Sequence, residues 1–99
     1  MTKSRLEPVH PGEVLVEEFI KPLGLTQSQL ARAIGVPPRR VNEIALRKRS
    51  ITADTALRLG RYFGNSPQFW LGLQMDYDLD VAGLRLGSSL NRIERSKAS

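Results

Sequence analysis

The stretch TQSQLARAIGVPPRRVNEI, residues 26–44, decides the fold that this 99-residue sequence predicts. Thr26 and the glutamine three positions later form a capping box, which starts a short helix that Gly35 ends. Pro37 or Pro38 then begins a second helix, with apolar residues at helical spacing along one side. Because only about three residues join them, the two helices must cross steeply, as in a helix-turn-helix motif.

Helical patterns also flank this motif on both sides. Before it, a helix is expected from Pro11 until Pro22 stops the pattern. After it, Thr52 caps a helix that Gly64 closes, and Ser66 followed by a proline opens another. Because no strand pattern competes, the sequence predicts an all-α fold, a compact bundle of about five helices.

The last of these helices carries large apolar side chains at helical spacing. Aromatic residues of this kind are usually buried, so we assign them to the core rather than to a ligand pocket. The residues assigned to the core are Phe69, Trp70, Leu73 and Tyr77.

At 99 residues the chain is long enough for one small domain. No apolar run approaches the ~20 residues of a membrane helix, the N-terminus lacks the apolar centre of a secretory signal, and cysteine is absent. We therefore expect a cytoplasmic protein without a membrane segment or disulfides. Three parts are predicted: a flexible N-terminal segment (1–9), a helix-turn-helix domain (10–78, motif about 26–45) and a helical or flexible C-terminal extension (79–99).

An enzyme would need a cluster of reactive side chains, and the sequence offers none. His10 is the only histidine, and without cysteine or a second histidine it makes no metal site. No glycine-rich phosphate loop is present, and the acidic residues lack a metal-binding spacing. We expect no enzymatic activity, no metal and no cofactor, and we interpret His10 as a capping or packing residue.

Positive charge is concentrated in the middle of the chain. The formal net charge is +5, and residues 36–62 alone hold seven arginines and lysines against two acidic residues. A single basic run is usually a solvated face, but the same charge within a helix-turn-helix motif favours binding to nucleic acid. A purely protein-binding module would not require this polarised basic surface.

The motif resembles the helix-turn-helix of the Cro/C1-type (Xre) repressors, which have alanine, glycine and a β-branched residue at the spacing of Ala31, Gly35 and Val41. HPGEVLVEEFIKPLG before it and KRSITADTALRLGRYFGNSPQFWLGLQMDYDL after it resemble the HigA antitoxins of HigB–HigA modules, also known as VapI-like plasmid-maintenance regulators. This resemblance implies a dimer that binds double-stranded operator DNA, represses its own operon and neutralises a HigB-like mRNA endonuclease toxin. A solitary regulator with the same DNA-binding core and no toxin is the alternative.

On a helical wheel, the second helix of the motif points Arg39, Asn42 and Glu43 outward. Arg39 can donate two hydrogen bonds to guanine, Asn42 can pair with adenine, and Glu43 can accept from cytosine or orient a neighbouring arginine. We predict base readout by these three residues together with Pro38, which fixes the start of the helix. Phosphate contacts are predicted for a second set of polar and basic residues: Thr26, Gln27, Arg40, Arg47, Lys48 and Arg49.

Arg47 departs from the family pattern, which has glycine just after the second helix of the motif. A left-handed cap at an arginine is strained by about 1 kcal/mol relative to glycine. We therefore expect the helix to run on past this position or to end in another way.

The C-terminal part carries an apolar stripe with a spacing of three or four residues: Leu79, Ala82, Leu86, Leu90 and Ile93. This spacing predicts a helix that packs on a partner, and all but the alanine are candidate residues of a dimer interface. A helix folded back on its own core is an alternative, and the glycines at 83 and 87 favour fraying instead. Three nearby acidic residues are either solvated or attract a basic toxin: Asp76, Asp78 and Asp80.

Overall fold

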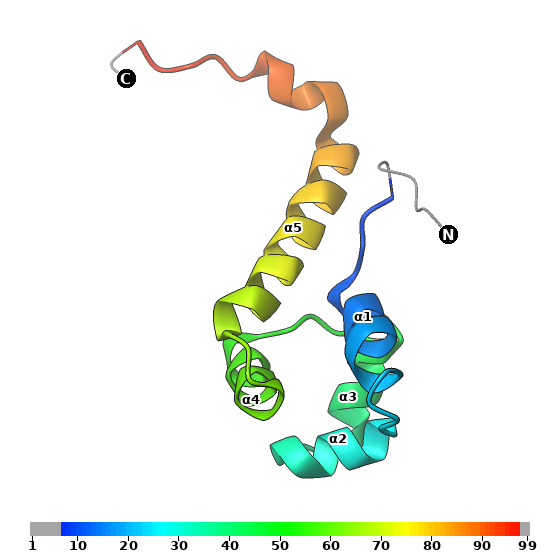
Figure 1. Ribbon diagram of the computed structural model, residues 1–99. Helices are drawn as coiled ribbons and strands as arrows, with labels where there is room; N and C mark the ends of the chain where they lie inside the picture. Colours follow the sequence, from blue (N-terminus) through cyan, green and yellow to red (C-terminus); the bar gives the residue numbers. More distant parts are fainter. Residues whose placement is uncertain (1–6, 98–99) are drawn as a thin grey trace.

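The computed structural model describes residues 7–97, and all regular structure in that range is helical (Figure 1). The elements, in chain order, are α1 (Pro11–Val14), the π-helical turn η1 (Leu15–Ile20), α2 (Gln27–Ile34), α3 (Pro38–Ala45), α4 (Ala53–Phe63), α5 (Pro67–Leu86) and the 3₁₀ segment η2 (Gly87–Arg92). The all-α prediction is confirmed. Residues 1–6 of the predicted flexible segment and the last two residues of the chain lie outside the described range. Within it, no helix is both long and apolar enough to cross a bilayer.

The helices begin where the sequence predicts, and side-chain caps fix three of the starts, those of α1, α2 and α5. Thr26 caps α2: its hydroxyl accepts from the Gln29 N–H at 3.0 Å, and the Gln29 side chain accepts from the Thr26 N–H at 2.8 Å. The Ser66 hydroxyl caps α5 by accepting from the Phe69 N–H at 3.1 Å. Thr52 occupies the capping position of α4, as predicted, but its side chain makes no capping hydrogen bond.

An apolar core lies between the helices, and Trp70 of α5 is its largest buried side chain. The Trp70 indole N–H donates to the Asn65 side-chain oxygen at 2.7 Å, so the polar group of the ring is satisfied. The Phe19 ring packs on it with 4.9 Å between ring centroids. Phe69, also predicted for the core, is 40% exposed, because successive residues of a helix point about 100° apart. The other buried apolar residues are Leu15, Ile20, Leu30, Ala31, Ile34, Val36, Val41, Ile44, Ile51, Ala56 and Leu59.

The C-terminal half of α5 extends beyond the bundle (Figure 1). The radius of gyration is 16.4 Å, against about 13 Å for a compact chain of this length. Leu79 is 63% exposed, so the alternative in which this helix folds back on its own core is wrong. The α-helix ends at Leu86, and Gly87 follows with a positive φ of 51°. Leu90 and Ile93 therefore lie beyond the helix, and the stripe predicted as a single helix is interrupted.

Candidate nucleic-acid interface

The two helices of the predicted motif, α2 and α3, pack against each other across the turn formed by residues 35–37. Gly35 ends α2 with a φ of 74°, a left-handed conformation that glycine adopts without strain. Val36 turns into the core, and the fully buried Ala31 is small enough to fit beneath the crossing. The predicted turn is confirmed, and it leaves Arg39 and Asn42 exposed on α3.

Glu43 holds two arginines at the exposed face of α3. Its carboxylate accepts from Arg39 Nε at 2.9 Å and from Arg49 Nε at 2.8 Å. These hydrogen bonds, first that of Arg39, lower the pKa of Glu43, so the carboxylate is ionised at neutral pH. The Arg39 side chain remains 82% exposed, and its bond to Glu43 uses Nε, which leaves both terminal nitrogens for an outside acceptor. Two such donors suit the O6 and N7 atoms of guanine.

The sequence left two roles open for Glu43, and the structure forms one of them, the orientation of neighbouring arginines. The carboxylate binds Arg39 and Arg49, whereas the neighbouring Arg40 donates to Asp54 instead. A direct contact of Glu43 with cytosine stays a prediction.

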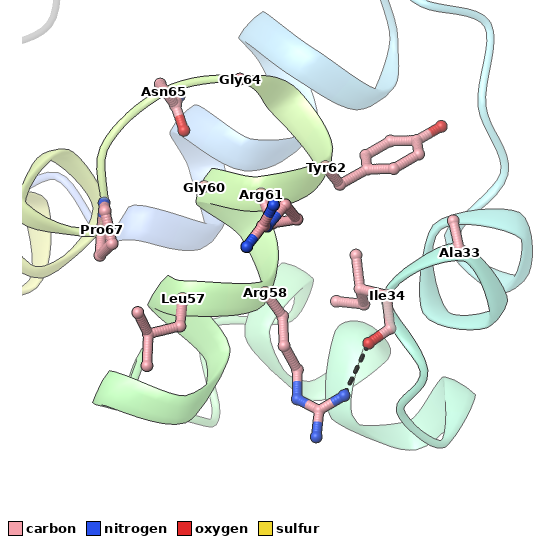
Figure 2. Close-up of a pocket in the computed structure, with 10 residues that line it drawn as sticks. All are labelled: Ala33, Ile34, Leu57, Arg58, Gly60, Arg61, Tyr62, Gly64, Asn65 and Pro67. Atoms are coloured by element: carbon pink, nitrogen blue, oxygen red, sulfur yellow. Dashed lines mark hydrogen bonds between the residues drawn. The ribbon is translucent and has the colours of Figure 1, made fainter.

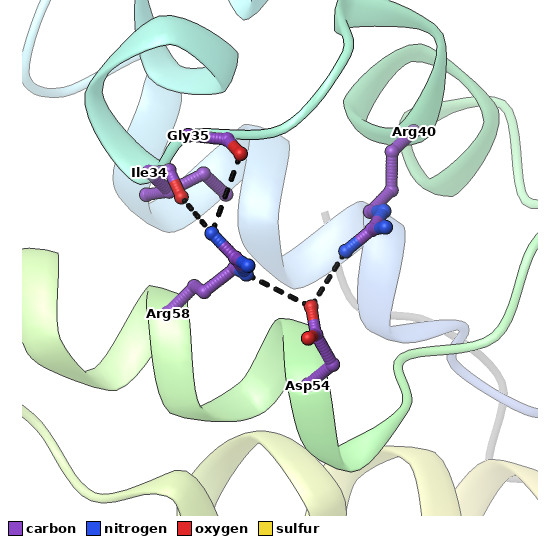
Figure 3. Close-up of polar contacts among 5 residues, drawn as sticks. All are labelled: Ile34, Gly35, Arg40, Asp54 and Arg58. Atoms are coloured by element: carbon purple, nitrogen blue, oxygen red, sulfur yellow. Dashed lines mark hydrogen bonds and ion pairs between the residues drawn. The ribbon is translucent and has the colours of Figure 1, made fainter.

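Arg40 lies towards α4 rather than towards solvent (Figure 3). Its Nη1 donates to Asp54 Oδ1 at 2.7 Å, and its side chain is 28% exposed. Hydrogen bonds from Arg58 and then Arg40 lower the pKa of Asp54, which keeps its charge at neutral pH. The guanidinium predicted to meet phosphate therefore already has a carboxylate partner within the protein.

Arg47 ends α3 in the left-handed conformation, with a φ of 64°, so the expectation that the helix avoids this cap is wrong. The Arg47 N–H donates to the Ile44 carbonyl at 3.0 Å and the Lys48 N–H donates to the Glu43 carbonyl at 2.8 Å. These are the two hydrogen bonds of a Schellman cap. The Arg47 guanidinium also donates to Glu13 of α1 at 2.8 Å. Satisfied carbonyls and this ion pair offset a strain of about 1 kcal/mol.

The remaining predicted contact residues lie at the edges of the same surface. Pro38 is the exposed first residue of α3, and Thr26 and Gln27 lie at the start of α2, where the Thr26 hydroxyl already serves the cap. Lys48 is exposed and, among residues 7–97, pairs with no carboxylate. Sequence reasoning missed Glu13 as the acidic partner of Arg47, because 34 residues separate the two.

His10 both caps and packs, as predicted. Its Nδ1 accepts from the Gly12 N–H at 2.9 Å at the start of α1, and its ring packs on the Tyr77 ring in a T-shaped arrangement with 4.8 Å between centroids. The residue is 5% exposed. Burial lowers the pKa of His10, the nearby Arg47 lowers it further, and Asp78 opposes them. The neutral imidazole is the form that this packing requires.

We expect the stability of the protein to fall as the pH drops below about 6.5, because the unfolded chain binds a proton at His10 more readily than the folded chain, in which the pKa is lowered. His10→Asn retains an acceptor for the Gly12 N–H but removes the titration. Urea unfolding between pH 7.5 and 5 should therefore show a loss of stability in the parent that is much smaller in the variant. An equal dependence of the free energy of unfolding on pH in the two proteins would contradict this account of His10.

A shallow groove of about 920 Å³ lies between the end of α2 and the second half of α4 (Figure 2). Leu57 and Tyr62 line it and are exposed, and Arg58 crosses it to donate to the Ile34 carbonyl at 2.8 Å. None of the residues predicted to contact bases or phosphates lines this groove. The predicted DNA surface and the groove are therefore separate features.

Known proteins share this sequence pattern. The Helix-turn-helix family model matches residues 16–70. The chain is 54% identical to Virulence-associated protein I of Dichelobacter nodosus over 80 residues, which cover 81% of this chain and 74% of that protein. It is 39% identical to Antitoxin HigA-1 of Vibrio cholerae over 79 residues, which cover 80% of this chain and 74% of that protein.

The fold is shared as well. Among solved structures, the Pseudomonas aeruginosa antitoxin HigA with the higBA promoter superimposes with a TM-score of 0.86 at 41% sequence identity. The superposition covers 92% of this chain and 99% of that one. The all-α architecture and its long C-terminal helix are therefore features that the two proteins have in common.

Proposed function

Because the chain belongs to the HigA-type antitoxins of the Cro/C1-type helix-turn-helix family, we propose that it binds operator DNA as a homodimer, represses its own operon and neutralises a HigB-like toxin. The family consists of regulators rather than enzymes, in agreement with the sequence-based expectation. The observation that carries the DNA-binding part is the exposed face of α3. There Glu43 orients Arg39 and leaves its terminal nitrogens accessible.

In this proposal α3 enters the major groove and its side chains divide the work of recognition. Arg39 reads guanine, and Asn42 reads adenine from the next turn of the same exposed face. Lys48 and Arg49, which follow the Schellman cap of α3, meet phosphate, as do the start of α2 and Gln27. The phosphate contacts fix the position of the protein, and the base contacts give it sequence preference.

Arg39→Ala and Lys48→Ala should weaken DNA binding in different ways. We expect Arg39→Ala to lose about 1–3 kcal/mol on the operator and to relax the preference at one base pair. Lys48→Ala should weaken binding to operator and unrelated duplexes about equally. It should also make the fall of log affinity with log salt less steep by about one. Titrations of both duplexes at several salt concentrations test this. Equal losses from Arg39→Ala on the two duplexes would remove it from base readout.

A dimer is proposed because one recognition helix reads only a few base pairs, and two half-sites about 34 Å apart need two copies. Apolar residues three or four positions apart form one stripe along α5, and an unpartnered stripe of this kind marks an interaction surface. We call it the α5 face, and it consists of Leu71, Met75, Leu79, Ala82 and Leu86. Leu71 and Met75 were not among the predicted interface residues, and they extend that surface towards the bundle. Leu90 and Ile93 remain candidates beyond the helix.

The antitoxin role predicts a growth phenotype. Inducing the small reading frame next to this gene should arrest growth, and co-expression of this protein should relieve the arrest. Arrest without relief, or no arrest, would favour the solitary regulator and leave the DNA-binding proposal intact. Arg39→Ala is the matched control, because a variant that fails in base readout should still relieve arrest if neutralisation depends on protein contact.

A further inference from the structure

One carboxylate on α4 connects both helices of the motif (Figure 3). Asp54 Oδ1 accepts from Arg40 of α3 at 2.7 Å and from Arg58, one turn further along α4, at 2.9 Å. Arg58 Nη1 in turn donates to the carbonyl oxygens of Ile34 at 2.8 Å and Gly35 at 3.3 Å, where α2 ends. A continuous chain of hydrogen bonds therefore runs from the end of α2 through α4 to the start of α3.

This network holds the motif on both sides of its turn. The last carbonyls of a helix lack partners within it and carry partial negative charge, so the Arg58 guanidinium satisfies and stabilises the end of α2. Asp54 fixes that guanidinium and also anchors Arg40, which belongs to the first turn of α3. The crossing of α2 and α3 is thereby fixed by charge-assisted hydrogen bonds as well as by the apolar core.

We propose that Asp54 positions the recognition helix for base readout, and that Arg40 is its partner in this role rather than a phosphate contact. The inference rests on the proposed DNA-binding function and specifies which residues give it sequence preference without contacting a base. The network of Asp54, Arg40 and Arg58 would hold α3 in place and thereby position Arg39 for its contact with a base. The phosphate role predicted for Arg40 is replaced by this one.

Asp54→Asn tests the proposal because positioning and simple electrostatics predict changes of opposite sign. The substitution removes a negative charge from the basic half of the protein, so electrostatics alone would strengthen binding to every DNA duplex. Asparagine keeps the shape but weakens the hydrogen bonds from Arg40 and Arg58. A positioning role therefore predicts weaker binding, confined to the sequence that α3 reads.

The probes are a duplex that the wild-type full-length protein selects from a random pool and a scrambled duplex of the same composition. We expect Asp54→Asn to bind the selected duplex about tenfold more weakly and the scrambled duplex no more weakly than wild type. Glu17→Gln is the matched control, because it removes the same charge and breaks a pair of the same i,i+4 spacing, Glu17–Lys21 at 2.9 Å. It should bind both duplexes within about twofold of wild type.

Arg40→Ala provides a second readout that does not depend on Asp54→Asn being folded. A phosphate contact predicts equal weakening on both duplexes and a salt slope lowered by about one. A positioning residue predicts an unchanged slope and weakening on the selected duplex alone. A double variant with Asp54→Asn and Arg40→Ala should then lose no more affinity for the selected duplex than the weaker-binding of the two single variants, because both changes break one network.

The outcomes separate this inference from the proposed function. If wild type prefers the selected duplex but Asp54→Asn binds it as tightly or more tightly, or if Arg40→Ala lowers the salt slope, the positioning role is overturned and DNA binding stands. A wild-type protein that shows no preference between the duplexes would overturn both.

Discussion

Gly12→Ala is expected to destabilise the protein by about 3 kcal/mol or more, a large share of the stability of a small domain. Gly12 is buried where α1 crosses α3, and a Cβ atom at this position would overlap the Ile44 carbonyl oxygen. Backbone cannot yield as a flexible side chain does, so α1 and α3 must separate. Thermal unfolding should show a melting temperature lower by roughly 12 °C or more.

The matched control is Gly72→Ala in α5, where an added Cβ would meet no atom within 4 Å. The higher helix propensity of alanine should leave this variant as stable as the parent or stabilise it by up to about 1 kcal/mol. A Gly12→Ala protein that unfolds at the parental temperature would mean that α1 and α3 pack less closely than the structure has them. Gly12→Ala should also weaken operator binding, since α3, the helix that it displaces, is the one proposed to read the DNA.

The sequence predicts most of the fold because its helix boundaries are set by local chemistry. The capping box at Thr26, the glycine at 35 and the prolines at 37 and 38 act within a few residues, and each begins or ends a helix where expected. The close approach at Gly12 escapes such reasoning, since the carbonyl that excludes a side chain lies 32 positions away in the chain.

The candidate site was predictable in its residue types and less so in their partners. Placing Arg39 and Asn42 on the exposed face of α3 needs only helical periodicity. That Arg40 binds Asp54, 14 positions away, depends on the tertiary packing of α4 against the motif. Counting charge shows a basic region but not which of its cations are already paired.

Arg47 shows how tertiary contacts can override a local preference. Backbone strain alone argued against a left-handed cap at a non-glycine residue. The two cap hydrogen bonds and the ion pair with Glu13 of α1 favour it instead. An arginine here gains a partner that glycine could not have, which the local sequence does not reveal.

Leu79→Asp is expected to convert the proposed dimer to a monomer and to weaken operator binding by about 10²–10⁴-fold, because the two half-sites would no longer be bound by one linked molecule. Leu79 lies at the centre of the α5 face and is 63% exposed, so aspartate should be tolerated by the isolated fold. Light scattering after size-exclusion chromatography gives the mass, and titration of the selected duplex gives the affinity.

Leu57→Asp in α4 separates loss of the α5 face from the general effect of adding a charge. Leu57 is 60% exposed, nearly the same as Leu79, but it lies in the groove beside α2 rather than on the α5 face. Both variants change the net charge equally, so the added charge by itself should weaken DNA binding by the same small factor in each. Only Leu79→Asp should lower the mass of the protein in solution from that of a dimer to that of a monomer. Only this variant should also bind a duplex with two half-sites no better than a duplex with one. A Leu79→Asp protein that remains dimeric would place the dimer interface elsewhere, since a buried, unpaired carboxylate at the centre of an apolar contact is strongly unfavourable.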